Sequence, residues 1–529
     1  GARNVAIGTH ALGSATTADL NVAIGQGAME SAAAGVAFLG AIAIGKDALT
    51  AINSTDANGT IAIGYQALSA LTDGQYNTAI GYHALTTNKR NDHNTAVGYR
   101  ALFAYSGSAA GTGGNTAVGS WCGDSVTTGT HNTLMGFYAG QALTTAGGSQ
   151  MIGSQAGYNT TTGTYNTAIG NEALYTNVVG NFNIAIGHKA GQYATGSNNT
   201  YIGFNSGQGA SNSAPFSSAQ QNTAVGMYTM QLVTTGGNNT ALGYGAINKN
   251  STGTDIVAIG KSAGYYATGS QNTFVGAEAG KGATTSAPYS SGQYNTAVGY
   301  RALEEFTTGG YNAILGQEAG EKITTGESNN LFGYRAGRHI TTGNSNIVIG
   351  SEALRDENVS SVVAIGSRAG LYNSGNDNVY LGDQAGRNSG AGTDQVIIGH
   401  DAGYYAYNND VVIIGESAGY YATGSNNVFV GKEAGKGGQT SAPYSSGQNN
   451  TALGYGTLKS FTTGYSNVAI GKDAGDAITT GFKNVAIGDS ALTSDDVGAG
   501  HIAIGGNALV TQNFASVNNE FEANISIGN

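Results

Sequence analysis

The chain is poor in cysteine and in charge, and each shortage excludes a class of protein. Its 529 residues include one cysteine, Cys122, so no disulfide can form within the chain. Charged residues make up 10%, against about a quarter in a typical domain. The net charge is −11 and no basic run is longer than Lys89-Arg90, which argues against a nucleic-acid partner because phosphate binding needs clustered positive charge. No stretch approaches the ~20 consecutive apolar residues of a membrane span.

Glycine and apolar residues are abundant instead. There are 87 glycines, 30 tyrosines and 40% apolar residues. The glycines do not recur at every third position, which excludes a collagen helix. The steady supply of isoleucine, valine and leucine with little charge does not fit a disordered chain. The composition therefore predicts a folded core that accommodates many glycines and few charges.

A short repeat runs through the whole sequence. Its best copies read Asn-Thr-Ala-Ile-Gly-Tyr-x-Ala-Leu or Ala-Gly, followed by a polar stretch that often ends in Thr-Thr-Gly. The glycine after the apolar residues recurs thirty times, and sixteen of the twenty-nine spacings are 17 residues while six are 16. The asparagine, the last apolar residue and the glycine define the repeat in three representative copies: Asn77, Ile80 and Gly81; Asn166, Ile169 and Gly170; Asn295, Val298 and Gly299.

This period predicts an all-β, parallel β-solenoid of about thirty ~17-residue rungs, continuous over residues 1–529. The apolar tetrad indicates a strand of four or five residues, and Ala-Leu or Ala-Gly a second short extended segment. The glycine of Thr-Thr-Gly is expected to take a positive φ in the next turn. The recurring asparagine either forms a stacked amide ladder or merely suits the backbone of the turn.

Both faces of the predicted strand are apolar. The Ile or Val before the glycine shares a face with the residue two positions earlier, while the residue between them, usually Ala, points the other way. One face is expected to meet the core of the solenoid and the other a partner, most simply another copy of the chain. The alternative is a monomer with a half-exposed alanine stripe.

The repeat resembles those of bacterial and phage tail-fibre proteins, and it is similar to the head repeats of YadA-like trimeric autotransporter adhesins. The resemblance covers Val5 to Gly528. It implies a homotrimeric fibre of left-handed parallel β-rolls, extracellular on a cell surface or virion, which serves attachment. The residues themselves show no catalytic or cofactor-binding motif, so we expect no catalytic activity and no cofactor. The period here is longer than that of YadA-like heads. No chaperone domain follows the repeats, and the chain begins and ends inside a repeat, so we expect a processed or truncated product.

Interruptions of the repeat are the candidate binding sites, because loops carry binding. All three prolines lie in similar Ser-Ala-Pro-aromatic-Ser-Ser insertions, near residues 208–221, 281–294 and 436–449. Tyrosines suit glycan contact through stacking and hydrogen bonding, although tyrosine is also an ordinary strand residue. The candidate receptor or glycan contacts are Pro215, Phe216, Pro288, Tyr289, Pro443, Tyr444, Tyr404 and Tyr405. The alternative is that each insertion is a decorated turn, duplicated with its neighbours.

Two other functions compete with the attachment fibre. A polymerised extracellular filament or sheath subunit would suit the uniform repeats. A tailspike-like polysaccharide depolymerase would need two carboxylates across a glycosidic bond, and the adjacent pairs Glu304-Glu305, Asp356-Glu357 and Asp495-Asp496 give no such placement. The eight histidines are dispersed and match no zinc-site spacing, so no metal site is predicted.

Overall fold

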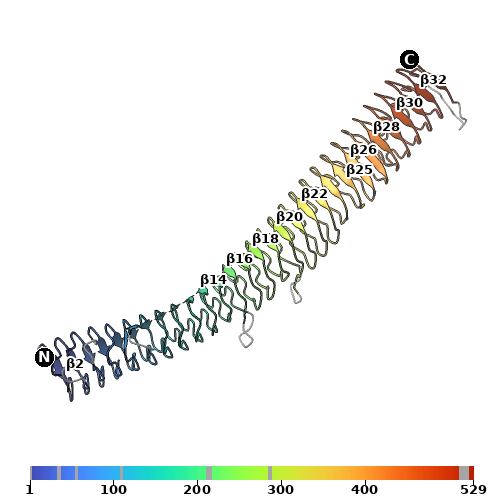
Figure 1. Ribbon diagram of the computed structural model, residues 1–529. Helices are drawn as coiled ribbons and strands as arrows, with labels where there is room; N and C mark the ends of the chain where they lie inside the picture. Colours follow the sequence, from blue (N-terminus) through green and yellow to red (C-terminus); the bar gives the residue numbers. More distant parts are fainter. Residues whose placement is uncertain are drawn as a thin grey trace. The chain divides into compact units, whose positions relative to one another are not determined.

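A computed structural model describes residues 3–31, 37–53, 58–107, 111–209, 217–283, 289–511 and 523–528. The chain divides into two compact units, Gly1–Thr268 (unit 1) and Gly269–Asn529 (unit 2), which are described separately. The predicted all-β parallel solenoid is confirmed, with about 28 turns of about 17 residues and no helix in the described residues. In each unit the short strands lie side by side along a stack of rungs (Figure 1).

Unit 1 contains fifteen strands of the main sheet and one small additional pair. The main strands are β1 (Val5–Ile7), β2 (Val22–Ile24), β3 (Ile42–Ile44), β4 (Ile61–Ile63), β5 (Thr78–Ile80), β7 (Thr95–Val97), β9 (Thr116–Val118), β10 (Thr133–Met135), β11 (Gln150–Ile152), β12 (Thr167–Ile169), β13 (Ile184–Ile186), β14 (Thr200–Ile202), β15 (Thr223–Val225), β16 (Thr240–Leu242) and β17 (Val257–Ile259). The additional pair is β6 (Asn91–Asp92) with β8 (Gly111–Thr112).

Unit 2 contains fifteen strands of the same kind. They are β18 (Thr273–Val275), β19 (Thr296–Val298), β20 (Ala313–Leu315), β21 (Asn330–Phe332), β22 (Ile347–Ile349), β23 (Val363–Ile365), β24 (Val379–Leu381), β25 (Gln395–Ile398), β26 (Val411–Ile414), β27 (Val428–Val430), β28 (Thr451–Leu453), β29 (Val468–Ile470), β30 (Val485–Ile487), β31 (Ile502–Ile504) and β32 (Ile525–Ile527). Within each unit successive rungs pair in parallel and in register, so equivalent residues stack.

Each rung is tighter than the repeat predicted. Nearly all of the strands have three residues, and β25 and β26 have four, where four or five were expected. The predicted second extended segment is wrong, because Ala-Leu forms part of a turn. In the rung of β5, His83 and Leu85 both have positive φ, of 57° and 52°. A residue in the left-handed region reverses the chain sharply, so the backbone folds back on the strand at once and leaves a narrow interior.

In many rungs two glycines lie against the backbone of the next rung. A Cβ on Gly81 would lie 2.3 Å from the carbonyl oxygen of Gly98, and the φ of Gly81 is +143°. Gly163, in a Thr-Thr-Gly turn, does not have the predicted positive φ. Its Cβ would instead lie 2.3 Å from the carbonyl oxygen of Gly180. The stacking distance between rungs therefore excludes a side chain at both places.

The alanine stripe lies inside the solenoid, so the expectation of a half-exposed alanine stripe in a monomer is wrong. We call the middle residue of a three-residue strand, or the third residue of a four-residue strand, the central residue. Ala79 and Ala168 are central residues, and both are 0% exposed. Their neighbours Ile80 and Ile169 face outward. Because side chains alternate along a strand, a strand of three residues presents only its central residue to the narrow core.

In the core, a large side chain at one of two positions goes with a small residue at the other. We call the residue six positions after the central residue the inner-turn residue. Where the central residue is Ala, as at Ala79, the inner-turn residue is often Leu, as at Leu85, and both are buried. Wherever the central residue is Leu, Met, Ile, Tyr or Phe, the inner-turn residue is Gly. A Cβ on the inner-turn Gly435 would lie 2.4 Å from Cδ1 of the central Phe429, so a core of this density has no room for both.

The three insertions follow rungs with an aromatic central residue. Tyr201, Phe274 and Phe429 precede the segments 208–221, 281–294 and 436–449, and all three rings are fully buried. Many uninterrupted rungs bury a further apolar side chain nine positions after the central residue, as Phe461 does. In the rung of Phe429 that position is Gly438, and the aromatic ring supplies the missing volume.

The asparagine that precedes most strands forms the amide ladder. Asn312 Oδ1 accepts hydrogen bonds from the backbone N–H and the Nδ2 of Asn329, at 3.0 and 3.1 Å. The Nδ2 of Asn312 donates to the carbonyl oxygen of Gly326 at 2.9 Å. Asn77, Asn166 and Asn295 make the same kinds of bond and are buried. The ladder therefore supplies hydrogen-bond partners to backbone groups that the three-residue strands leave unpaired.

Candidate functional site

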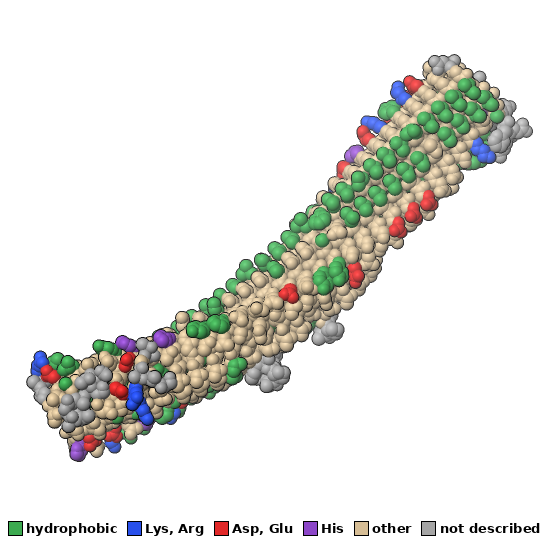
Figure 2. All heavy atoms as spheres, viewed as in Figure 1, with side chains coloured by type: hydrophobic (Ala, Val, Ile, Leu, Met, Phe, Trp, Pro, Cys, Tyr) green, Lys and Arg blue, Asp and Glu red, His purple; other side chains and the backbone are tan. Residues whose placement is uncertain are grey.

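The outward face of the sheet is the most regular surface of each unit. The last residue of every strand in the main sheet is Ile, Val, Leu, Met or Phe, and none of these residues is buried. Leu315 is 49% exposed and Ile349 40%. No strand of the main sheet contains Asp, Glu, Lys or Arg. Rows of hydrophobic side chains run along unit 2 (Figure 2), over the strands labelled in Figure 1. We call this surface the strand face.

Aromatic rings extend the strand face beyond the strand ends. The residue two positions after the last strand residue is often aromatic, and the rings of successive rungs stack. Tyr65 and Tyr82 have ring centroids 5.0 Å apart, and Tyr82 and Tyr99 5.5 Å apart. Tyr82 is 46% exposed and Tyr99 42%. Such a ladder covers only the ring faces that neighbouring rungs share, so the outer edges stay available to a partner.

The structure joins the third insertion to a tyrosine cluster in unit 2. Tyr444 follows Pro443 in the insertion, and its ring stacks on that of Tyr405 at 4.5 Å and on that of Tyr421 at 5.9 Å. Tyr404 stacks on Tyr420 at 4.9 Å. The cluster therefore brings Tyr404, Tyr405 and Tyr444 together, as predicted candidate contacts, although sequence spacing gave no reason to join them. Their ring faces are largely covered by one another.

The polar surroundings of the cluster also hold it in place. The Nη1 of Arg387 donates to the Tyr404 hydroxyl at 2.6 Å, and the guanidinium lies 5.3 Å from the centre of the same ring. Burial, with the nearby Asp401 carboxylate, raises the pKa of Tyr420 to about 12. The phenol therefore remains protonated near neutral pH and keeps its hydrogen-bond donor.

The other predicted insertion contacts are only partly described. Pro215, Phe216 and Pro288 lie outside the described residues. Tyr289 is half-buried, and Pro443 is exposed. Two of the insertions rejoin the solenoid at a buried serine. Ser217 forms an isolated parallel β-bridge with Ala194, and Ser445 forms one with Ala422. Contact of these residues with a receptor or glycan stays a prediction.

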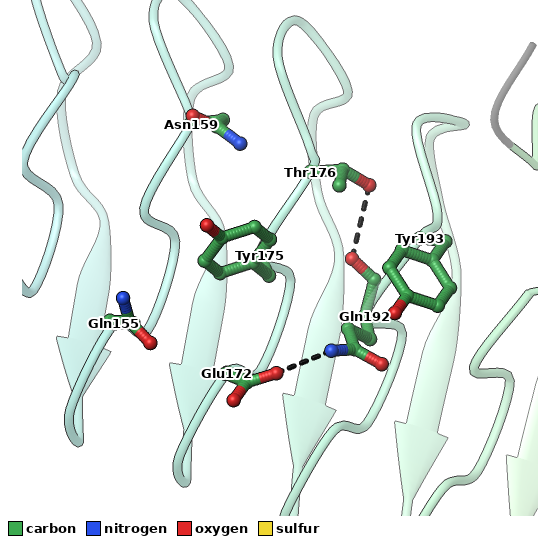
Figure 3. A pocket seen from close by; sticks show the side chains of 7 residues that line it. All are labelled: Gln155, Asn159, Glu172, Tyr175, Thr176, Gln192 and Tyr193. Atoms are coloured by element: carbon green, nitrogen blue, oxygen red, sulfur yellow. Dashed lines mark hydrogen bonds between the residues drawn. The ribbon is translucent and has the colours of Figure 1, made fainter. Parts of the chain in front are cut away.

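A hollow on unit 1 was missed by the sequence reasoning. It has a volume of about 440 Å³ and is lined by Gln155, Asn159, Glu172, Tyr175, Thr176, Gln192 and Tyr193. These side chains come from three successive rungs, those of β11, β12 and β13 (Figure 3). No residue of the hollow belongs to an insertion or to a tyrosine pair, which are the signals the sequence offered.

Three of the adjacent carboxylates identified in the sequence form ion pairs with lysine or arginine. Glu304 is 3.3 Å from Lys281, Glu305 pairs with Lys322, and Asp356 Oδ2 is 2.6 Å from Arg355 Nη2. These ion pairs indicate a structural role for the carboxylates.

The third adjacent pair reaches the interior of the solenoid. Asp495 Oδ2 lies 3.4 Å from Nε2 of His501, and both residues are buried. His501 occupies the ladder position in its rung, and its backbone N–H donates to Asn484 Oδ1. Burial raises the pKa of Asp495.

Metal sites and membrane-spanning helices are considered for the part of the chain that the structure describes. No group of three or more His, Cys, Asp and Glu side chains is placed to hold a metal ion. No helix there has the length and apolar character to cross a membrane.

The ion pairs between rungs give a testable pH dependence. Hydrogen bonds from Lys436 and Lys459 lower the pKa of Glu433 from 4.5 to about 2. A carboxyl group with a lowered folded-state pKa stabilises the fold above its unfolded pKa, and this contribution is lost as pH falls from about 4.5 to about 2. We expect Glu433→Gln to reduce stability by about 1 kcal/mol near neutral pH, since water screens a surface pair. Urea unfolding at pH 6 and pH 2 should show the difference at pH 6 alone, and an equal difference at both would contradict it.

Comparison with known proteins places the chain in no family. No protein-family model and no curated protein matches it. The resemblance to tail-fibre proteins and YadA-like adhesins, with the left-handed trimeric arrangement that it implies, therefore stays a prediction.

Proposed function

We propose that the protein is a structural fibre of the attachment type, a homotrimer joined through the strand face and displayed outside the cell or on a virion. The strand face is the observation that supports this most strongly. Each of the thirty strands of the main sheet ends in an apolar residue of this face and carries no charged residue, and rows of apolar side chains of this extent are costly to leave in water.

The regular spacing of the face favours a second copy of the chain as its partner. Outward residues recur at the separation of adjacent strands, about 4.8 Å. Only a surface with the same repeat matches that spacing rung for rung. Cyclic symmetry would set equivalent rungs of each copy at the same height, so that Ile, Val and Leu rows meet each other.

The form of the surface supports attachment rather than catalysis as the proposed role. The tyrosine cluster offers hydroxyl groups and ring edges for contact with a receptor or glycan. Glu304, Glu305 and Asp356 form ion pairs with basic groups of their own chain, which gives these carboxylates a structural role.

Cysteine cross-linking tests the interface directly. We expect Leu315→Cys, on the strand face, to form covalent dimers on mild oxidation at micromolar protein, because symmetry brings copies of residue 315 to one height. Thr325→Cys is the matched control, since Thr325 is exposed in the Thr-Thr-Gly turn of the same rung, away from the strand. The native Cys122 is buried, and burial raises its pKa to about 12, so it should stay inert. Equal cross-linking of the two variants would contradict the proposed interface.

A further inference from the structure

The hollow on unit 1 exists because a stack of tyrosines stops. Tyr158 and Tyr175 occupy equivalent positions in successive rungs, and their rings are nearly parallel with centroids 5.1 Å apart. The equivalent residue of the next rung is Gln192, whose Nε2 donates to the Glu172 carboxylate. Among the described residues, no third ring covers the remaining face of Tyr175. Tyr193, one position further along the chain, stands on the opposite side of the gap (Figure 3).

The polar side chains around this gap have unused hydrogen-bonding capacity. Glu172 Oε2 accepts from Gln192 and lies 3.9 Å from Lys189 Nζ. Its other oxygen, Oε1, has no hydrogen-bond partner in the described part of the chain. The side-chain amides of Gln155 and Asn159 likewise make no hydrogen bond to described residues. A carboxylate oxygen and two amides therefore point into or border a hollow between two aromatic rings.

A chain of amides holds the floor of the hollow in one arrangement. Asn248 donates to Gln231 at 3.2 Å, Gln231 to Gln208 at 3.0 Å, and Gln208 to Gln192 at 2.8 Å. Gln192 then donates to Glu172. All of these bonds run in the same sense and end on a carboxylate, so each strengthens the next. The acceptor groups of the hollow are thereby oriented before any ligand arrives, which lowers the entropic cost of binding.

We infer that the hollow between Tyr175 and Tyr193 binds a neutral oligosaccharide. An aromatic ring offers its face to the C–H side of a pyranose, while amide and carboxylate groups take the sugar hydroxyls as donors and acceptors. The volume of about 440 Å³ lies within the ~300–1,000 Å³ range of ligand pockets. The Lys189 ammonium offsets the Glu172 charge, so the site has no excess charge to select an ionic ligand.

This inference deepens the proposed attachment function, on which its biological meaning rests, and it names the ligand class. The site is separate from the tyrosine cluster of unit 2, whose rings cover one another. Burial and the neighbouring Tyr158 and Glu172 raise the pKa of Tyr175. The Tyr175 hydroxyl therefore remains a donor under the conditions of a binding assay.

The test is a titration of the full chain with maltotetraose, cellotetraose and mannotetraose, followed by saturation-transfer NMR and calorimetry. At least one should bind, and Tyr193→Ala should weaken that binding about tenfold, equivalent to about 1.4 kcal/mol. Gln192→Tyr should abolish it by continuing the Tyr158–Tyr175 stack into the hollow, at a position that takes tyrosine in the two preceding rungs. Tyr311→Ala, at a 62% exposed tyrosine outside both the hollow and the tyrosine cluster, is the control and should bind as the unaltered chain does.

Three results would overturn the assignment. They are no binding of any of the three sugars at millimolar concentration, binding that survives Gln192→Tyr, and binding lost in Tyr311→Ala but kept in Tyr193→Ala. The native mass of each variant separates this inference from the proposed assembly. If a variant loses sugar binding but keeps its oligomeric mass, the result tests the hollow and leaves the proposed assembly unaffected. If the chain binds sugar as a monomer, the result contradicts the proposed assembly and leaves the hollow unaffected.

Discussion

Gly435→Leu is expected to destabilise the rung of β27 strongly. A Cβ at this position would lie 2.4 to 2.6 Å from three atoms of the Phe429 ring, and leucine adds three further carbons. The backbone itself accepts leucine, because Gly435 has φ 55° and Leu85 already occupies the equivalent position at φ 52°. The clash with the ring is therefore the cause, and we expect a loss of about 3 kcal/mol or more.

A double-mutant cycle isolates this clash. Phe429→Ala alone should cost about 3–5 kcal/mol by leaving a cavity. In Phe429→Ala/Gly435→Leu the leucine refills that cavity, which recreates the alanine–leucine pairing of Ala79 and Leu85. We expect a favourable coupling of about 2 kcal/mol or more. Hydrogen exchange of β27 and β28 in the full chain measures it locally, since rungs contact mainly their neighbours, and additive effects would contradict the volume exchange.

Asn312→Leu is expected to break the amide ladder at one rung. The substitution keeps the approximate shape but removes the acceptor for Asn329 and the donor for the Gly326 carbonyl, both inside the solenoid. Each buried group left unpaired costs about 1–3 kcal/mol, so we expect a loss of about 2–4 kcal/mol.

Asn312→Ser is the matched control for the ladder. Ser149 occupies the same position naturally, and its Oγ accepts from the backbone N–H of Asn166 at 3.3 Å. Serine keeps the acceptor and loses only the donor, so about half the effect is expected in thermal unfolding and hydrogen exchange. If Asn312→Leu were no worse than Asn312→Ser, the asparagine would serve only the backbone conformation of the turn.

The period of the repeat was sufficient to predict the fold, because it can be satisfied by only a few architectures. Thirty glycines at spacings near 17 residues leave no room for two helices per repeat. The internal detail was harder to predict. Alternation along the strand shows that Ala79 and Ile80 face opposite ways, but not which of them faces inward. That depends on how sharply the next turn folds back, and the positive φ of His83 and Leu85 carries no signal in those residue types.

The candidate sites show the same limit. The tyrosine pair Tyr404-Tyr405 and the insertion residue Tyr444 were recognised separately, because each interrupts the repeat. Their contact depends on how the inserted loop folds against neighbouring rungs. The hollow of unit 1 has no local signature at all. It arises where Gln192 takes the place that tyrosine holds in the two preceding rungs, and this is visible only when equivalent positions are aligned in space.

The native mass of the chain in solution, from light scattering coupled to size exclusion, tests the assembly most directly. The proposed fibre predicts a particle of three times 53.1 kDa with an elongated profile, in which the strand face is covered by two further copies. A particle of 53.1 kDa that persists at high protein concentration would contradict the trimer and leave the apolar strand face exposed to water.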